Sequence, residues 1–209
     1  MADKFLILEL REPKLNRVLT DLRSIFSGKK HLTNIHITLK GPQKTIPLAK
    51  GPQKTIVFAN AKDMEEYKSK NAIIQIGGVG RFLNGAFHVV YLGVKCGDLR
   101  KYKLWRKPNY KEDYNPHITL YEGTDRLLAD AVYEFLTLEN IEYECDQYDF
   151  TIHTRGEQFN LFLDAFSQDQ ICLPDKEEAL CERARRMIKR VYAYNDCAKL
   201  TTNNHAVLS

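Results

Sequence analysis

The chain has 209 residues, of which 44% are hydrophobic and 28% are charged, and its formal net charge at pH 7 is +4. These values predict a packed globular core, in one large domain or in two small lobes. The mild positive charge is compatible with an anionic substrate, but no basic run is long enough for a nucleic-acid-binding tail.

Cysteine usage and the N-terminal sequence bear on the cellular compartment. Five cysteines are scattered along the chain without a C-x-x-C pair: Cys96, Cys145, Cys172, Cys181 and Cys197. Their odd number and irregular spacing argue against a disulfide framework or a zinc knuckle and favour reduced thiols. The apolar run in MADKFLILEL is too short for a signal peptide or a membrane span. We therefore expect a cytoplasmic protein that is not associated with membranes.

The first third of the chain predicts a strand, a helix and a second strand. Residues 4–10 are apolar and β-rich, which is typical of a buried strand. Pro13 begins a segment, residues 13–27, whose apolar side chains recur at helical spacing, and Gly28 is a typical C-terminal stop. Residues 31–39 predict the next strand, which ends in the sequence His-Ile-Thr-Leu.

A short tandem duplication follows this strand. The sequence GPQKTI occupies residues 41–46 and again residues 51–56. Two copies of so short a unit do not indicate a repeat architecture, and we favour a duplicated loop or hairpin. The alternative is a flap containing lysine and glycine that touches phosphate.

The middle of the chain predicts a helix and a hairpin. Residues 61–70 read as a short helix and residues 71–76 as a strand. The glycine-rich segment 77–82 leads into another strand, residues 87–94, instead of a helix, which excludes a dinucleotide-binding loop or a P-loop. Asn84-Gly85 indicates a tight turn between the strands.

The remainder alternates again between strands and helices. Asp125 is positioned to cap the first of the two predicted helices. The expected elements are a turn or short helix at 99–105, a loop at 106–115, strands at 117–121, 141–149, 150–153 and 160–166, helices at 125–138 and 175–193, and a polar tail over the last dozen residues. The Arg183–Arg186 cluster is interpreted as a solvated helix face in preference to a nucleic-acid site.

Two of the predicted strands carry the same tetrapeptide. His36-Ile37-Thr38-Leu39 recurs as His-Ile-Thr-Leu at residues 117–120. Because side chains alternate along a strand, each copy places a histidine and a threonine on one face and two apolar side chains on the other. Two imidazoles and two hydroxyls brought together would suit acid/base chemistry on a phosphate ester.

Other interpretations of the histidines carry less weight. A third His-x-Thr, at His31, lacks the apolar residue after threonine, and we treat it as accidental. A zinc site would need a third ligand at suitable spacing, and no HExxH or acidic partner is evident. His88 and His153 are interpreted as ordinary strand residues. A purely structural role for both tetrapeptides is a further alternative, but matching motifs on two strands are hard to obtain by accident.

The chain resembles the two-histidine (2H) phosphoesterase superfamily over about residues 4–166. The resemblance is carried by the two H-x-T-hydrophobic motifs, by the NPHITL form of the second motif, and by the segment GVGRF before HVVYLGV. The resemblance implies an α+β, bilobal fold, in which two similar lobes of antiparallel strands with flanking helices surround a central cleft within residues 1–167. Residues 168–209 would form a C-terminal helical extension and a polar tail.

The resemblance also implies the roles of the motif residues. His36 and His117 would be the acid/base pair, and Thr38 and Thr119 would bind the non-bridging phosphate oxygens. We hypothesise that His36 activates water or a ribose hydroxyl and that His117 protonates the leaving oxygen, although the sequence does not fix this direction. No cofactor and no metal would be required.

Three further residues are candidates for substrate binding. Tyr121 alternates onto the face of His117 and Thr119, where it would stack on a base. Phe82 is a second stacking candidate, and Lys40 shares a face with His36 and would meet a phosphate.

We expect a metal-independent phosphodiesterase whose partner is a nucleotide or oligonucleotide substrate, with no obligate protein partner evident. The substrate classes are RNA ends with a 2′,3′-cyclic phosphate, 2′–5′ oligoadenylates and cyclic oligonucleotide messengers. Two alternatives remain: a nucleotide- or RNA-binding module of the same fold without turnover, and an interaction protein that works through the helix at 175–193.

Overall fold

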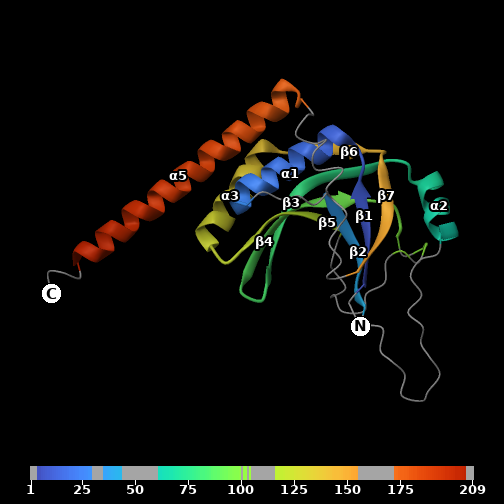
Figure 1. Ribbon diagram of the computed structural model, residues 1–209, viewed down its shortest axis with the longest axis horizontal. Coiled ribbons are helices and arrows are strands. Elements are labelled where there is room, and N and C mark those ends of the chain that lie inside the picture. Colours follow the sequence, from blue (N-terminus) through green and yellow to red (C-terminus); the bar gives the residue numbers. More distant parts are fainter. Residues whose placement is uncertain are drawn as a thin grey trace, which may run out of the picture.

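The computed structural model describes residues 4–29, 35–43, 61–99, 101–102, 104, 116–154 and 172–205, without the side chains of residues 4, 40–43, 154 and 195–205. Within these ranges the chain has an α+β fold with two antiparallel sheets and four helices (Figure 1). The helices are α1 (Pro13–Ser27), α2 (Ala61–Lys70), α3 (Arg126–Glu139) and α5 (Asp175–His205).

Each sheet contains one copy of the motif, on an edge strand. The three-stranded sheet has the order β2 (His36–Gln43), β1 (Lys4–Leu10), β7 (Tyr148–Thr154). The four-stranded sheet has the order β5 (His117–Gly123), β4 (Phe87–Lys95), β3 (Ile74–Asn84), β6 (Glu142–Cys145). The expectation of two groups of strands, each contributing one histidine strand, is confirmed at this level.

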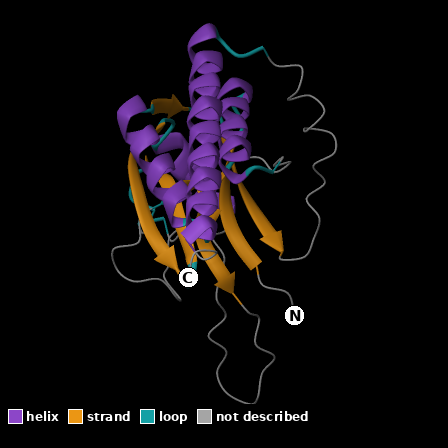
Figure 2. Cartoon of the chain, turned by 90° about the vertical axis from the view of Figure 1, so that its left-hand side faces the viewer, coloured by secondary structure: helices purple, strands orange, loops and turns teal. Residues whose placement is uncertain are grey.

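One hydrophobic core lies under both sheets. Leu6, Leu8 and Leu10 of β1 are completely buried, and they belong to the same core cluster as Leu92 of β4 and Val132 of α3. Figure 2 shows the long helices in front of the strands, on one side of the fold. The sheets therefore have a common inner face, which is covered by helices, and each has an outer face.

Local signals explain where the helices begin and end. Helix α1 starts at Pro13 and stops at Gly28, which adopts the left-handed conformation at φ 65°. Helix α3 is capped by Asp125, whose carboxylate accepts a hydrogen bond of 3.0 Å from the amide of Leu128. Gly85, at φ 61°, makes the turn between β3 and β4. These features match the expectations from sequence.

The elements depart from expectation in three places. The strands expected at 141–149 and 150–153 are instead β6, Glu142–Cys145, and β7, Tyr148–Thr154. The strand expected at residues 71–76 continues through the glycine-rich segment, because β3 is one strand from Ile74 to Asn84, with a register shift between Ile76 and Val79, where Gly78 has φ 72°. The prediction of a polar tail is wrong for the first part of the last dozen residues, because helix α5 continues to His205. The expected strand at 160–166 and both GPQKTI copies beyond residue 43 lie outside the described residues.

The first half of α5 belongs to the core. Leu180, Cys181, Ala184 and Ile188 are buried, and the helix contacts α1 and α3. Arg183 donates two hydrogen bonds of 2.7 Å to Glu139 of α3, and this ion pair lowers the pKa of that carboxyl. Farther along, α5 projects from the rest of the fold (Figure 1). Among the described residues, no helix is both long enough and apolar enough to cross a bilayer.

Asn16 connects helix α1 to the first motif strand. Its side chain, 5% exposed, donates to the carbonyl of Leu10 at 2.9 Å and accepts from the amide of Ile35 at 3.1 Å. Leu10 and Ile35 are also joined directly by a backbone hydrogen bond of 3.1 Å. The amide that Asn16 holds is thus one residue before His36, at the point where the chain enters β2.

We expect Asn16→Ala to destabilise the protein by about 2–4 kcal/mol. The substitution leaves the buried amide of Ile35 without its side-chain acceptor and removes the side-chain hydrogen bond to the Leu10 carbonyl. Urea unfolding measures this change. Arg17→Gln, which removes a partly buried ion pair with Asp21 one turn along the same helix, is the control and should cost less than about 1 kcal/mol. Equal effects of both substitutions would contradict the role of Asn16.

Candidate active site

The motif strands place their four polar residues on the outer faces of the sheets. Ile37 and Leu39 are at most 1% exposed, as are Ile118 and Leu120, and all four belong to the common core. The histidine and threonine of each copy alternate with these residues and therefore lie on the opposite face. The alternation that the sequence predicts for residues 36–39 and 117–120 is confirmed.

The two copies also share an irregularity of the backbone. In the first sheet Ile7 pairs with Thr38 and Leu6 pairs with Lys40, so that Leu39 is an additional residue without a partner. In the second sheet Tyr91 pairs with Thr119 and Val90 with Tyr121, which leaves Leu120 as the additional residue. Both are β-bulges at the leucine of the tetrapeptide. The copies are therefore equivalent in structure as well as in sequence.

This bulge corrects the expected position of Tyr121. Tyr121 pairs with Val90, which is completely buried on the inner face, whereas Thr119 pairs with Tyr91 on the outer face. Tyr121 is 4% exposed, donates a hydrogen bond of 3.1 Å to the carbonyl of Asp125, and has its pKa raised by burial. The expectation that it shares a face with His117 is wrong, because the extra residue reverses the alternation. For Lys40, the side chain lies outside the described residues.

Strands β2 and β5, which carry the motifs, are in contact. Each is the edge strand of its sheet, so the contact joins the sheets edge to edge. Helix α1 contacts β5 although it follows β1 in the chain, which ties the inner faces of the sheets together. The two outer faces therefore adjoin along the line where the motif strands meet. The structure brings the His36–Thr38 pair and the His117–Thr119 pair to this line.

Aromatic rings surround the second histidine. The ring of Tyr91 lies with its centroid 4.6 Å from that of His117, and the ring of Phe82 lies 5.5 Å away in an edge-to-face arrangement. The imidazole is 9% exposed, whereas Phe82 remains 38% exposed. The placement of Phe82 beside the motif agrees with its expected position, and it offers an exposed ring next to a histidine.

Two glycines make room for this cluster. A Cβ atom at Gly80 would overlap the Tyr91 ring, which crosses the neighbouring strand at that point. Gly93 is the pairing partner of His117 and has no side chain that would compete with the imidazole for space. Gly80 of β3 and Gly93 of β4 therefore leave space for the aromatic rings around His117.

A carboxylate lies opposite the first histidine. Glu9 of β1 pairs with His36 in the register, so both side chains lie on the outer face as direct cross-strand neighbours. Glu9 is 6% exposed and forms an ion pair of 2.8 Å with Arg11. On its other side, Thr151 donates a hydrogen bond of 3.4 Å to the same carboxylate. The two motifs thus differ in their surroundings: charged and polar at His36, aromatic at His117.

Sequence reasoning missed Glu9 and Tyr91. Both lie one strand away from a motif, and only the register of β1 with β2, or of β4 with β5, makes them neighbours. His153 lies on β7 beside Phe5, with ring centroids 6.5 Å apart, and His88 faces α3 from the inner side of β4. Neither is part of a motif strand, as expected.

Among the described residues, no three His, Cys, Asp or Glu side chains are grouped so that they could hold a metal ion. No protein-family model matches the chain, and comparisons with curated proteins and with solved structures find no match. The assignment of a function therefore depends on the site itself.

We expect Gly80→Ala to destabilise the fold by about 1–3 kcal/mol, because the new methyl group displaces the Tyr91 ring. The substitution Tyr91→Ala removes the clash. The loss of stability in the double variant should therefore be smaller than the sum of the two single losses by about 0.5–3 kcal/mol. Denaturant unfolding of the four proteins in the cycle measures this coupling. Strictly additive effects would show that the ring does not lie over Gly80.

Proposed function

We propose that this protein is a metal-independent phosphodiesterase of the two-histidine type, with the bilobal 2H phosphoesterase fold. The observation that supports the proposal most is the structural equivalence of the two tetrapeptides. Each lies on an edge strand, places His and Thr on the outer face, and has a bulge at its leucine, and the two strands are in contact. A purely structural role for either copy would not require this match.

The proposed chemistry divides the work between the two imidazoles. His36 activates water or a ribose hydroxyl for attack on phosphorus, and His117 protonates the leaving oxygen. A proton is removed on one side of the phosphate and supplied on the other, so no net charge has to build up. Thr38 and Thr119 donate hydrogen bonds to the non-bridging oxygens, whose charge the transition state redistributes.

The proposed substrate is a phosphodiester in an RNA-like or signalling nucleotide. The exposed ring of Phe82, 5.5 Å from His117 between ring centroids, provides a surface on which a base can stack beside the reacting phosphate. A base-bearing substrate explains why an aromatic side chain remains exposed next to the motif. The three nucleotide classes expected from sequence all meet this description.

The test is turnover in the presence of EDTA. The wild-type protein is incubated with 2′,3′-cyclic mononucleotides, 2′–5′ oligoadenylate, cyclic dinucleotides and RNA ending in a cyclic phosphate, and products are identified by mass spectrometry. We expect cleavage that survives chelation and that falls by about 10²–10⁴-fold in His36→Ala and in His117→Ala. His153→Ala removes a histidine that lies in the same sheet as His36 but outside the motifs, and this variant should retain activity.

Three results would overturn the proposal. Full turnover in both motif variants would show that the histidines are not the acid and base. If chelation abolishes activity and a divalent cation restores it, the reaction requires a metal and the metal-free mechanism is wrong. Binding of a nucleotide without any product, unchanged by either substitution, would indicate a binding module without turnover.

A further inference from the structure

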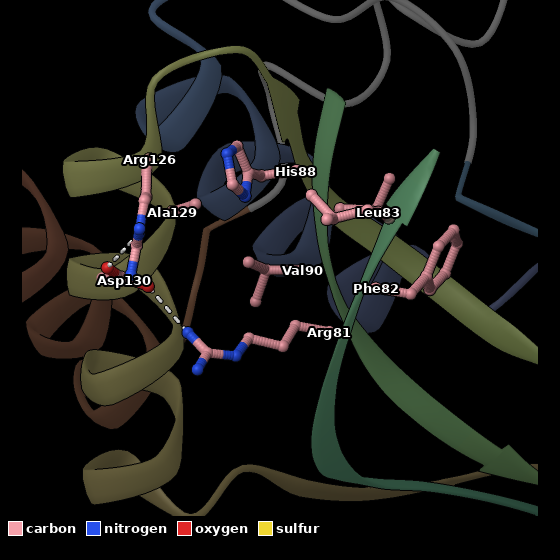
Figure 3. Close-up of a pocket in the computed structure, with 9 residues that line it drawn as sticks. Arg81, Phe82, Leu83, His88, Val90, Arg126, Ala129 and Asp130 are labelled. Atoms are coloured by element: carbon pink, nitrogen blue, oxygen red, sulfur yellow. Dashed lines mark hydrogen bonds and ion pairs between the residues drawn. The ribbon is translucent and has the colours of Figure 1, made fainter. Parts of the chain in front are cut away.

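A cavity lies on the inner side of the β3–β4 hairpin, between the hairpin and the start of α3 (Figure 3). Its volume is about 310 Å³. Val90 and Ala129, both buried, form an apolar floor. Arg81 and His88 from the hairpin and Arg126 and Asp130 from the helix contribute the polar groups. None of these residues belongs to the candidate active site.

The charges in the cavity are unequal. Asp130 accepts one contact from each arginine: its Oδ1 is 2.6 Å from Nη1 of Arg81, and its Oδ2 is 3.6 Å from Nε of Arg126. One carboxylate thus serves two guanidinium groups, so the cluster keeps a net positive charge. Each guanidinium has five N–H donors, and a single carboxylate cannot use them all. Donors and charge are therefore left for an anion.

Arg81 is also held in a defined position. Its guanidinium carbon lies 4.8 Å from the centre of the Tyr133 ring, in addition to its contact with Asp130. A fixed guanidinium loses little conformational freedom on binding, which favours recognition of an oxyanion. His88, which also lines the cavity (Figure 3), adds a ring nitrogen.

Strand β3 connects the cavity with the surroundings of His117. Phe82 is among the lining residues, but its ring lies against His117 on the face of the sheet opposite to that of Arg81, because adjacent residues of β3 point to opposite faces. Strand β6 pairs with β3 only up to Gly77, so in the described part of the chain the segment 79–84 is an outer edge. A bound chain that contacts both the ring of Phe82 and the guanidinium of Arg81 would pass around this edge.

We propose that Arg81, Arg126 and His88 form a second phosphate-binding site, which takes a further phosphate of the same substrate. This inference rests on the proposed function and makes it more specific. A substrate that occupies both sites has at least two phosphates and a base between them on Phe82. The protein then acts on oligonucleotides in preference to cyclic mononucleotides.

The binding test uses a fluorescein-labelled RNA trinucleotide and the His36→Ala/His117→Ala protein, in which the label is not cleaved. Fluorescence anisotropy gives the Kd at several salt concentrations. Arg126→Gln should weaken binding by about tenfold, as expected for the loss of a charged hydrogen bond. It should also reduce the slope of log K against log salt by about 0.7, the value for one phosphate contact of a single strand. Arg81→Gln should act in the same direction.

Arg185→Gln is the matched control, since Arg185 is an exposed arginine of α5 that pairs with Glu182 within one helical turn. It should change neither Kd nor slope. Arg126 has a side chain that is 79% exposed, so its substitution should leave the thermal midpoint unchanged. A slope that does not change in Arg126→Gln, or an equal change in Arg185→Gln, would overturn the inference.

A kinetic comparison separates this inference from the proposed function. In the otherwise wild-type protein, Arg126→Gln should raise KM for the trinucleotide about tenfold while kcat and the constants for a 2′,3′-cyclic mononucleotide stay unchanged. If the wild type cleaves both substrates and Arg126→Gln affects neither, only the second site is disproved. If Arg126-dependent binding is observed without any cleavage, the second site survives and the phosphodiesterase assignment fails.

Discussion

The structure depends on the burial of four apolar side chains beneath the motifs. Ile37, Leu39, Ile118 and Leu120 lie in one core, and this burial holds the alternating histidines and threonines on the outer faces. A slip of either strand by one residue would exchange the two sets, so the hydrophobic core also fixes the register of the polar residues. Because both strands are edge strands in contact, the same core brings the two polar pairs together.

Much of this arrangement follows from local sequence. The limits of α1 and α3 follow from Pro13, Gly28 and Asp125, whose effects act within a few residues and do not depend on distant contacts. The turn at Asn84-Gly85 is local in the same sense. The faces of the motif strands follow from strict alternation over four residues. Candidate catalytic residues were therefore identifiable without a structure.

Features that depend on pairing between distant strands were not predictable. An extra residue in one strand is defined only relative to its partner, so the bulge at Leu120 and the consequent inward position of Tyr121 leave no mark in the sequence. The neighbours of the histidines, Glu9 and Tyr91, are set by register in the same way. They give the two copies different surroundings, charged at one histidine and aromatic at the other.

The central claim is that both histidines act on one phosphate. NMR of the protein with ¹⁵N-labelled histidine, titrated with a nucleoside–vanadate complex as a mimic of the pentacoordinate transition state, tests this most directly. The account predicts that the ring signals of His36 and His117 change together along one saturable curve, while that of His153 does not. Changes at only one motif histidine, or two curves with different midpoints, would contradict a shared reaction centre.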